Sequence, residues 1–302
     1  MYEKILVPLD GSELAELALP YAEELSGRLG SEVTLLAVTE SAEVQDYHKQ
    51  QIYLQRRIDV AESGIKRYLE KPKGEEIKVK SAILVGHTAE EIVDYADKED
   101  IGLIIMATHG RSGISRWALG SVADKVVRAA KQPVALIRAK GARNDLREGG
   151  ILNKVLVPLD GSKESETIIP YIKELASRLK VELTLLMVVT KAYHVEAVGE
   201  EMVQIPYTEN EMGLLTANAG SYIQKMEDLL KGEGIATRTE IKLGDAAEEI
   251  IKIADELRSD MVAMSTHGRS GISRWTLGSV ANKVLHGGNT PVLLVNEPKA
   301  NT

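Results

Sequence analysis

The chain has 302 residues, of which 44% are hydrophobic and 27% charged, with no cysteine and a formal net charge of −8 at pH 7. This length corresponds to about two domains, and the composition excludes a collagen, a coiled coil and a disordered chain. The acidic balance argues against a general nucleic-acid binder. No apolar run approaches the ~20 residues of a membrane span. The lack of cysteine excludes disulfides, thiol catalysis and cysteine zinc sites, and it fits a cytoplasmic protein.

Short apolar runs alternate with amphipathic segments along the first half of the chain. The N-terminus enters the first run directly, so no signal peptide is expected. Five runs predict strands: Lys4–Leu9, Val33–Val38, Ile77–Val85, Gly102–Ala107 and Val134–Ile137. The segments between them predict helices: Leu14–Leu25, Asp59–Leu69, a stretch opened by Thr88, and Val122–Ala130.

Two local signals refine the predicted helices. Pro20 stands inside the first helix, where it removes a backbone hydrogen bond, so a bend is expected there. Thr88 and Glu91 form a capping-box pattern, in which the threonine side chain caps the helix and the glutamate returns a hydrogen bond. The second half of the chain carries Asp245 and Glu248 as the equivalent pair.

The second half of the chain repeats the first. Ile5–Ser12 (ILVPLDGS) returns as Val155–Ser162 (VLVPLDGS), and the ten residues Thr108–Trp117 return unchanged as Thr266–Trp275. Over residues 107–137, 20 of 31 positions are identical to their counterparts. The chain therefore consists of two copies of one domain.

We expect the first domain to span residues 1–140 and the second residues 151–297. The linker between them, residues 141–150, contains several glycines and mixed charges with little periodicity. The copies differ most in Ser41–Ala61 and Lys191–Gly220. We interpret most of each segment as divergent surface loop and helix; the alternative is a flap over a ligand or a surface for a partner.

The alternation of strands and helices predicts an α/β fold. Its central strands are uniformly apolar, which is typical of a parallel sheet covered by helices on both faces. We therefore expect two copies of a five-stranded parallel sheet sandwiched by helices. Ligands of such sheets bind outside the carboxyl ends of the strands, at a topological switch point. This places the candidate site at Asp10, Val38 and the loop after Ala107.

The loop Gly110–Ser121 has the residues of an anion site. Its glycines allow the backbone to approach a ligand closely, and it ends at a helix N-terminus, whose unpaired N–H groups suit a phosphate. Ser121 could donate its hydroxyl there; the alternative is a tight turn in which Ser121 caps the helix. The Walker A spacing and the dinucleotide fingerprint are both absent.

Asp10 and His109 are further candidates beside this loop. Asp10 could accept a hydrogen bond from a sugar or a base; the alternative is a strand-to-helix turn capped by Ser12. His109 and its counterpart His267 could act as general bases, but a histidine that bonds nearby backbone and shapes the loop is favoured. No cluster of histidines and carboxylates has metal-ligand spacing, so we assign no catalytic residue and no metal ligand.

Together these motifs resemble the universal stress protein family in its tandem two-domain form. The segments that carry the resemblance are Val7–Ser12 (VPLDGS), Leu35–Val38 (LLAV) and Thr108–Val122, with their counterparts in the second copy. The resemblance implies a Rossmann-like sheet of the adenine nucleotide alpha-hydrolase-like type, with strand order 3-2-1-4-5. It also implies binding of an adenine nucleotide, ATP foremost with ADP or AMP as alternatives, and Mg²⁺ held through the nucleotide phosphates.

The nucleotide-binding branch of that family carries the pattern Gly-x2-Gly-x9-Gly-Ser/Thr. Both copies match it except at the first glycine, where Ala107 and Ser265 stand. In the first copy the resemblance implies nucleotide contacts at Pro8, Asp10, Val38, Ala107, Gly110, Gly120, Ser121 and Val122. In the second copy the implied contacts are Pro158, Asp160, Val188, Ser265, Gly268, Gly278, Ser279 and Val280. By the same resemblance, Asp10 lies near the ribose, Val38 at the adenine, and the glycines and serine at the phosphates.

Three functions remain open at this stage. The favoured one is a nucleotide-binding protein of stress response or regulation, with slow hydrolysis at most, because no base, metal carboxylate or arginine finger is evident. The first alternative is an interaction module with vestigial pockets, supported by Ala107 and Ser265. The second is a slow ATPase or autophosphorylating enzyme, so enzymatic activity is left undecided.

The resemblance also bears on assembly. The last strands of the copies, Pro133–Ile137 and Pro291–Val295, are expected to pair within the chain as an intramolecular pseudo-dimer, which would cover two edges open to aggregation. A further homodimer of the tandem chain is conceivable but has no sequence pattern in its support. No nucleic-acid or membrane partner is expected, and the sequence indicates no particular protein partner.

Overall fold

The computed structural model describes residues 1–40, 43–69, 78–108, 119–138, 150–190, 193–198, 201–268 and 277–296. The first repeat contains β1 (Lys4–Pro8), α1 (Glu13–Glu16), α2 (Leu19–Leu29), β2 (Glu32–Thr39), α3 (Val44–Lys66), β3 (Val79–Val85), α4 (Thr88–Lys98), β4 (Leu103–Ala107), α5 (Ser121–Ala129) and β5 (Val134–Ile137). The second repeat contains β6 (Lys154–Pro158), α6 (Lys163–Glu166), α7 (Ile169–Leu179), β7 (Glu182–Val189), β8 (Tyr193–Val198), β9 (Glu201–Pro206), α8 (Glu209–Gly232), β10 (Thr237–Leu243), α9 (Ala246–Glu256), β11 (Met261–Ser265), α10 (Ser279–Gly287) and β12 (Val292–Val295).

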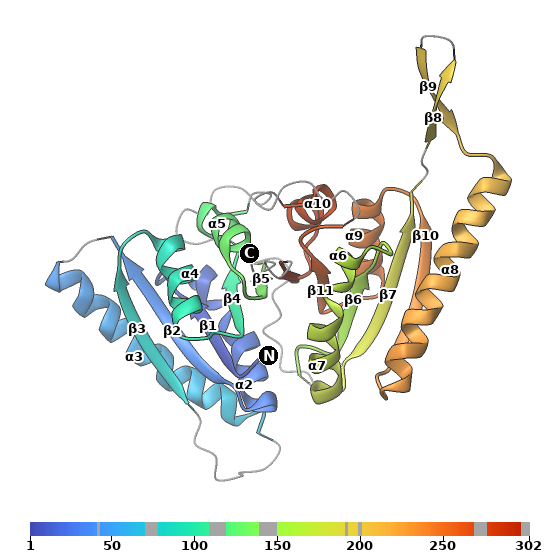
Figure 1. The fold of residues 1–302 in the computed structure, drawn as a ribbon. Coiled ribbons are helices and arrows are strands. Elements are labelled where there is room, and N and C mark those ends of the chain that lie inside the picture. Colours follow the sequence, from blue (N-terminus) through green and yellow to red (C-terminus); the bar gives the residue numbers. More distant parts are fainter. Residues whose placement is uncertain are drawn as a thin grey trace.

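Ten of these strands form one sheet that runs through both repeats (Figure 1). Its order is β10-β7-β6-β11-β12-β5-β4-β1-β2-β3, so each half has the predicted order 3-2-1-4-5 and parallel pairing. At the centre β5 and β12 pair antiparallel, with Leu293 opposite Ala135. The predicted pairing of the two last strands is therefore confirmed, and it joins the two expected sheets into one.

Each face of this sheet has its own apolar core, and each core extends through both repeats. Residues of α2, α3, α7 and α8 build the core on one face. Residues of α4, α5, α9 and α10 build the core on the other. Neighbouring strand residues alternate between the cores, as Ile105 and Met106 do, because successive side chains of a strand point to opposite faces. The central strands are thus buried on both sides, as their uniformly apolar sequences predicted, whereas the edge strands β3 and β10 are partly exposed.

Two predictions about helix ends are corrected. The helix expected over Leu14–Leu25 is broken into α1 and α2, and Pro20 occupies the first turn of α2, where its missing N–H is tolerated. Helix α4 begins at Thr88 with His87 as its N-cap, so the predicted cap by Thr88 is wrong. In the second repeat the prediction holds, because Asp245 accepts hydrogen bonds from Ala247 N (3.0 Å) and Glu248 N (3.2 Å).

The two most divergent segments contain a long helix in each repeat. Residues 44–61 belong to α3, so the helix predicted over Asp59–Leu69 begins earlier, at Val44, and ends at Lys66. In the second repeat the segment also holds the antiparallel hairpin β8–β9, which was not predicted. Figure 1 shows this hairpin projecting beyond the sheet, between β7 and α8. Within the described ranges, no helix is long and apolar enough to cross a membrane.

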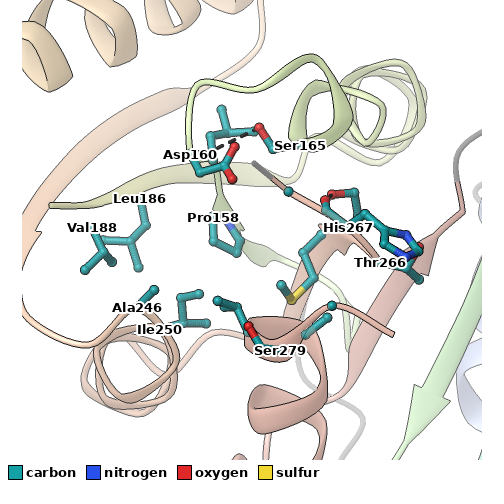
Figure 2. A pocket seen from close by; sticks show the side chains of 17 residues that line it. Pro158, Asp160, Ser165, Leu186, Val188, Ala246, Ile250, Thr266, His267 and Ser279 are labelled. Carbon is teal, nitrogen blue, oxygen red and sulfur yellow. Dashed lines mark hydrogen bonds between the residues drawn. The ribbon is translucent and has the colours of Figure 1, made fainter. Parts of the chain in front are cut away.

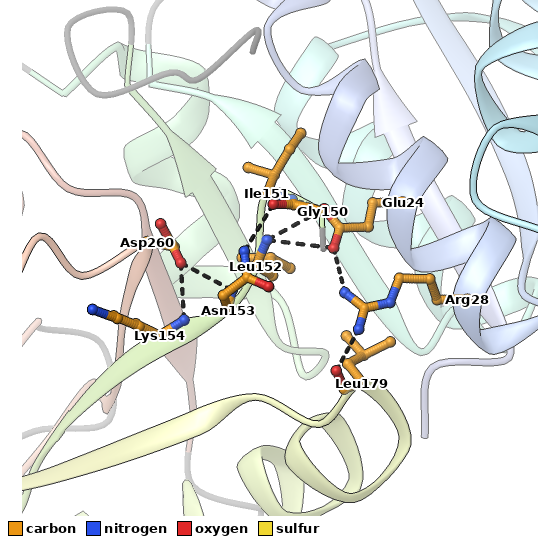
Figure 3. Close-up of polar contacts among 9 residues, drawn as sticks. All are labelled: Glu24, Arg28, Gly150, Ile151, Leu152, Asn153, Lys154, Leu179 and Asp260. Carbon is orange, nitrogen blue, oxygen red and sulfur yellow. Dashed lines mark hydrogen bonds and ion pairs between the residues drawn. The ribbon is translucent and has the colours of Figure 1, made fainter. Parts of the chain in front are cut away.

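The start of the second repeat is held by buried carboxylates (Figure 3). Glu24 of α2 accepts hydrogen bonds from Ile151 N (2.5 Å) and Leu152 N (3.3 Å), and it pairs with Arg28 at 2.6 Å. Asp260 accepts hydrogen bonds from the next two backbone N–H groups, those of Asn153 at 2.9 Å and Lys154 at 2.8 Å. The expected linker, residues 141–150, lies outside the described residues apart from its last glycine. The domain limits 1–140 and 151–297 remain predictions.

Candidate functional site

A cavity of about 230 Å³ lies in the second repeat, at the carboxyl ends of β6, β7 and β11. Figure 2 shows that its walls differ in character. Leu186, Val188 and Ala246 make one end apolar. The other end is lined by Gly268, Gly278 and Ser279, of which Ser279 begins α10. The cavity thus sits where a parallel α/β sheet binds its ligands.

All eight residues implied for the second copy line this one cavity. They are Pro158, Asp160, Val188, Ser265, Gly268, Gly278, Ser279 and Val280. The structure therefore brings the set together, while contact with a nucleotide stays a prediction for each member. Sequence analysis missed Leu186, Ile250 and Met264 in the wall. Leu186 and Met264 are ordinary apolar strand residues, which only the alternation of β-strand faces could have indicated, and Ile250 lies on the apolar face of α9.

In the first repeat the implied residues occupy equivalent places in the fold. Pro8 and Ala107 end β1 and β4, Asp10 follows β1, Val38 is in β2, Gly120 precedes α5, and Ser121 and Val122 begin it. Gly110 and His109 lie outside the described residues. One backbone hydrogen bond beside the site recurs in both repeats: Gly120 N donates to Thr108 O and Gly278 N donates to Thr266 O, each at 2.8 Å.

The carboxylate after the first strand of each repeat shapes a turn. Asp160 Oδ1 accepts hydrogen bonds from Ser162 N at 2.9 Å and Ser162 Oγ at 2.5 Å. Ser162 Oγ in turn caps α6 by accepting from Ser165 N at 3.1 Å. Asp10 and Ser12 repeat this arrangement at 2.9 and 2.6 Å. The strand-to-helix turn weighed for Asp10 is thus present, and it also orients the carboxylate at the cavity wall (Figure 2).

Two glycines of the second site lie in close contact with other atoms, Gly278 with backbone and Gly268 with a side chain. A Cβ atom on Gly278 would lie 2.8 Å from the Thr266 carbonyl oxygen, and one on Gly268 would overlap Oδ2 of Asp160. Gly278 is the N-cap of α10 and offers no side chain to its first turn. The N–H groups at this helix start therefore face the cavity region without a side-chain cap, which suits an anion.

Ser265 and His267 complete the polar end. The Ser265 hydroxyl donates to the His267 carbonyl oxygen, so the side chain that replaces the first glycine of the pattern is turned to the loop backbone. His267 Nδ1 lies 3.0 Å from Thr266 Oγ1, and its buried Nε2 has no hydrogen-bond partner in the described part of the chain. His267 thus contacts a neighbouring side chain, whereas a backbone partner was expected. Among the described residues, no group of three or more metal-ligating side chains is found.

A model of the universal stress protein family matches residues 1–138 and 152–296. The chain belongs to this family. A Methanocaldococcus jannaschii universal stress protein, MJ0577, is 33% identical over 162 residues, covering 47% of this chain and 98% of that protein. A Synechocystis universal stress protein, Slr1230, is 24% identical over 313 residues, covering 96% of this chain and 99% of that protein. This alignment and the two family matches show the tandem two-domain form.

Solved structures share the fold over the full length. A universal stress protein from Archaeoglobus fulgidus DSM 4304 superposes with a TM-score of 0.67 at 20% identity, covering 98% of this chain and 99% of that chain. At this identity the likeness establishes the fold alone. Both repeats of this universal stress protein therefore share their architecture with the Archaeoglobus fulgidus structure.

Proposed function

We propose that this universal stress protein binds an adenine nucleotide in each repeat, ATP foremost, and acts in the cytoplasm as a regulator of the stress response. The observation that supports the proposal best is the cavity of the second repeat, which joins an apolar end to a helix start without a side-chain cap. A nucleotide has the same two parts, an apolar base and an anionic phosphate chain. The family's glycine pattern, matched in both repeats apart from its first position, supports the same assignment.

Each part of the ligand has a matching part of the wall. The base would lie between Leu186, Val188 and Ala246, where the cavity is apolar. The ribose would lie beside Asp160, a hydrogen-bond acceptor fixed by its turn. The phosphates would take backbone N–H groups at Gly278 and the hydroxyl of Ser279. Mg²⁺ would supply charge compensation there, held mainly by phosphate oxygens.

The wall also favours binding over turnover. Its one carboxylate among the described residues is Asp160, and Ser162 occupies one of its oxygens. Fast phosphoryl transfer needs positioned groups for the attacking water, the metal and the developing charge. We therefore propose slow hydrolysis at most. Occupancy would act by favouring one conformation or partner complex, which requires different affinities for the two states.

Nucleotide content and titration test this function. Protein purified without added nucleotide would be denatured, the released small molecules identified by mass, and ATP with Mg²⁺ titrated by calorimetry. Two sites per chain are expected. Ser121→Ala should weaken the first site directly and Ser279→Ala the second, because each removes one hydroxyl from one helix start.

The alternatives predict different results. If no nucleotide is released and no heat of binding is measured up to millimolar ATP, the interaction module with vestigial pockets is the remaining function. Rapid release of phosphate that Asp160→Asn abolishes without loss of binding would favour the enzyme. One site per chain would show that the two repeats have diverged.

A further inference from the structure

Asn296, directly after β12, crosses from the second repeat to the first. Its side-chain Nδ2 donates hydrogen bonds to the carbonyl oxygens of Val127 (2.8 Å) and Ala130 (2.7 Å). These residues lie at the end of α5, and the last carbonyls of a helix lack partners within the helix. Asn296 therefore satisfies the C-terminal end of a helix whose other end, at Ser121, begins the candidate site of the first repeat.

The chemistry of these contacts fixes the direction of a hydrogen-bond chain. Both partners on α5 are carbonyl acceptors, so the NH₂ group of Asn296 must face them and its Oδ1 must face away. Oδ1 accepts from Thr266 Oγ1 at 2.7 Å, a closer contact than the 3.4 Å from the same hydroxyl to the Val295 carbonyl oxygen. That bond uses the only hydroxyl proton of Thr266, so His267 Nδ1, at 3.0 Å, carries a proton and donates to Thr266 Oγ1.

Thr266 lies where the second site is built. It lines the cavity, and its carbonyl oxygen accepts from Gly278 N at 2.8 Å, directly before α10. Its own N–H donates to Val295 O at 2.9 Å. Asn296 thus holds, through one side-chain bond, the residue that positions both His267 and the glycine at the helix start.

The equivalent position in the first repeat has different chemistry. Arg138 follows β5 as Asn296 follows β12, and its Nη1 donates to the carbonyl oxygen of Gly288 at the end of α10. A guanidinium has five donors and no acceptor. Arg138 can therefore satisfy the helix end but cannot accept the hydroxyl of Thr108, which is the counterpart of Thr266.

We propose that Asn296 is a positioning residue through which helix α5 of the first repeat holds the nucleotide loop of the second. The proposal rests on nucleotide binding at both sites. It deepens that function by making the second site depend on the first repeat, whereas the first site has no such support from Arg138. A nucleotide bound at the first site would restrain α5 at its N-terminal residue Ser121 and would thereby favour binding at the second site. Thermodynamic linkage makes this effect reciprocal.

The test uses the full chain and two matched variants at the same interface. Asn296→Leu removes both the bonds to α5 and the acceptor for Thr266. Arg138→Met removes the mirror-image bond to Gly288 and leaves the Thr266 chain in place. By calorimetry, Asn296→Leu is expected to weaken binding at the second site about ten-fold, the weight of one hydrogen bond. Arg138→Met is expected to keep the affinity of the second site.

A second measurement separates positioning from general damage. Ser121→Ala, which impairs the first site, is expected to weaken the second site in the native chain but not in the Asn296→Leu chain. In addition, ¹⁵N spectra of the imidazoles should show His267 protonated at Nδ1 in the native protein. This preference should be lost in Thr266→Val. It should weaken in Asn296→Leu, where the Thr266 hydroxyl keeps only the Val295 carbonyl oxygen as an acceptor.

The outcomes distinguish this inference from the proposed function. Native affinity of the second site in Asn296→Leu would overturn the inference while two bound nucleotides still supported the function. An equal loss in Arg138→Met would also overturn it, because general loosening of the interface would then account for both. No binding by the native chain would overturn the function and the inference together. Should Asn296→Leu fail to fold, Thr266→Val decides by the same affinity and the same His267 spectrum.

Discussion

At the scale of single residues, the second site depends on the glycine at position 278, which has no side chain. Gly278 has an ordinary negative φ of −56°, so backbone conformation does not require glycine there. Space does, because a Cβ atom would lie 2.8 Å from the Thr266 carbonyl oxygen, closer than a carbon and a carbonyl oxygen pack. That oxygen belongs to backbone and cannot turn away as a flexible side chain could.

Gly278→Ala should therefore displace the start of α10 from the cavity. We expect a loss of about 1 to 3 kcal/mol in stability, as for other overpacked sites, and loss of nucleotide binding at the second site. Gly213→Ala is the control: it lies inside α8 with no atom within 4 Å of the new Cβ, and helix propensity predicts a gain of about 0.5 to 1 kcal/mol. Calorimetry and urea unfolding measure both effects, and unchanged binding in Gly278→Ala would contradict the close-approach argument.

At the scale of elements, α2 packs a carboxylate against α3. Glu23 lies over Gly64 of α3, where a Cβ atom would overlap its carboxylate. Burial raises the pKa of Glu23 to about 7, and the positive charge of Arg67 opposes this only partly. The folded protein therefore binds this proton more tightly than the unfolded chain does.

This pKa makes the helix pair sensitive to pH. The stabilisation from protonated Glu23 is fully present below the unfolded value of 4.5 and is lost as pH rises through about 7. Thermal unfolding should therefore show a fall in Tm between pH 5 and pH 8 that is larger in the native protein than in Glu23→Gln. Glu256→Gln, at an exposed position late in α9, should keep the native pH profile. Parallel profiles for the native protein and Glu23→Gln would refute the assignment.

The same scale shows what sequence could predict. The strands and the Asp245 cap follow from local patterns, apolar runs and a carboxylate before a helix, and the structure has them. The cap at Thr88 failed because the helix begins one residue before the pattern requires. For the site, the family resemblance selected eight residues in the second repeat, and all eight line the cavity. The position of Leu186 in the wall and the hydrogen bonds of Asn296 could not be predicted in this way. They depend on strand register and on contact between the repeats, and neither is a local property of the sequence.

At the scale of the whole molecule, pseudosymmetric carboxylates join the repeats. Glu24 of α2 and Glu174 of α7 occupy equivalent places, and each binds the start of the other repeat. Glu24 receives the N–H groups of Ile151 and Leu152, and Glu174 pairs with the N-terminal amine of Met1 at 3.0 Å. The environments differ, because the Glu24 side chain is 0% exposed and that of Glu174 is 23% exposed. Burial raises the pKa of Glu24 in spite of the bonds from Arg28 and the two backbone N–H groups.

This difference predicts unequal costs of removing the two carboxylates. Glu24→Ala removes the acceptor of two buried N–H groups and the ion-pair partner of Arg28, whose guanidinium keeps its hydrogen bond to the Leu179 carbonyl oxygen (Figure 3). It should therefore destabilise the chain by about 3 to 5 kcal/mol. Glu174→Ala removes a solvent-screened pair and should cost less than about 1 kcal/mol. Because both apolar cores run through both repeats, urea unfolding should stay a single transition in the native chain. In Glu24→Ala the midpoint should move furthest, and an equal shift in the two variants would show that burial does not set the strength of this junction.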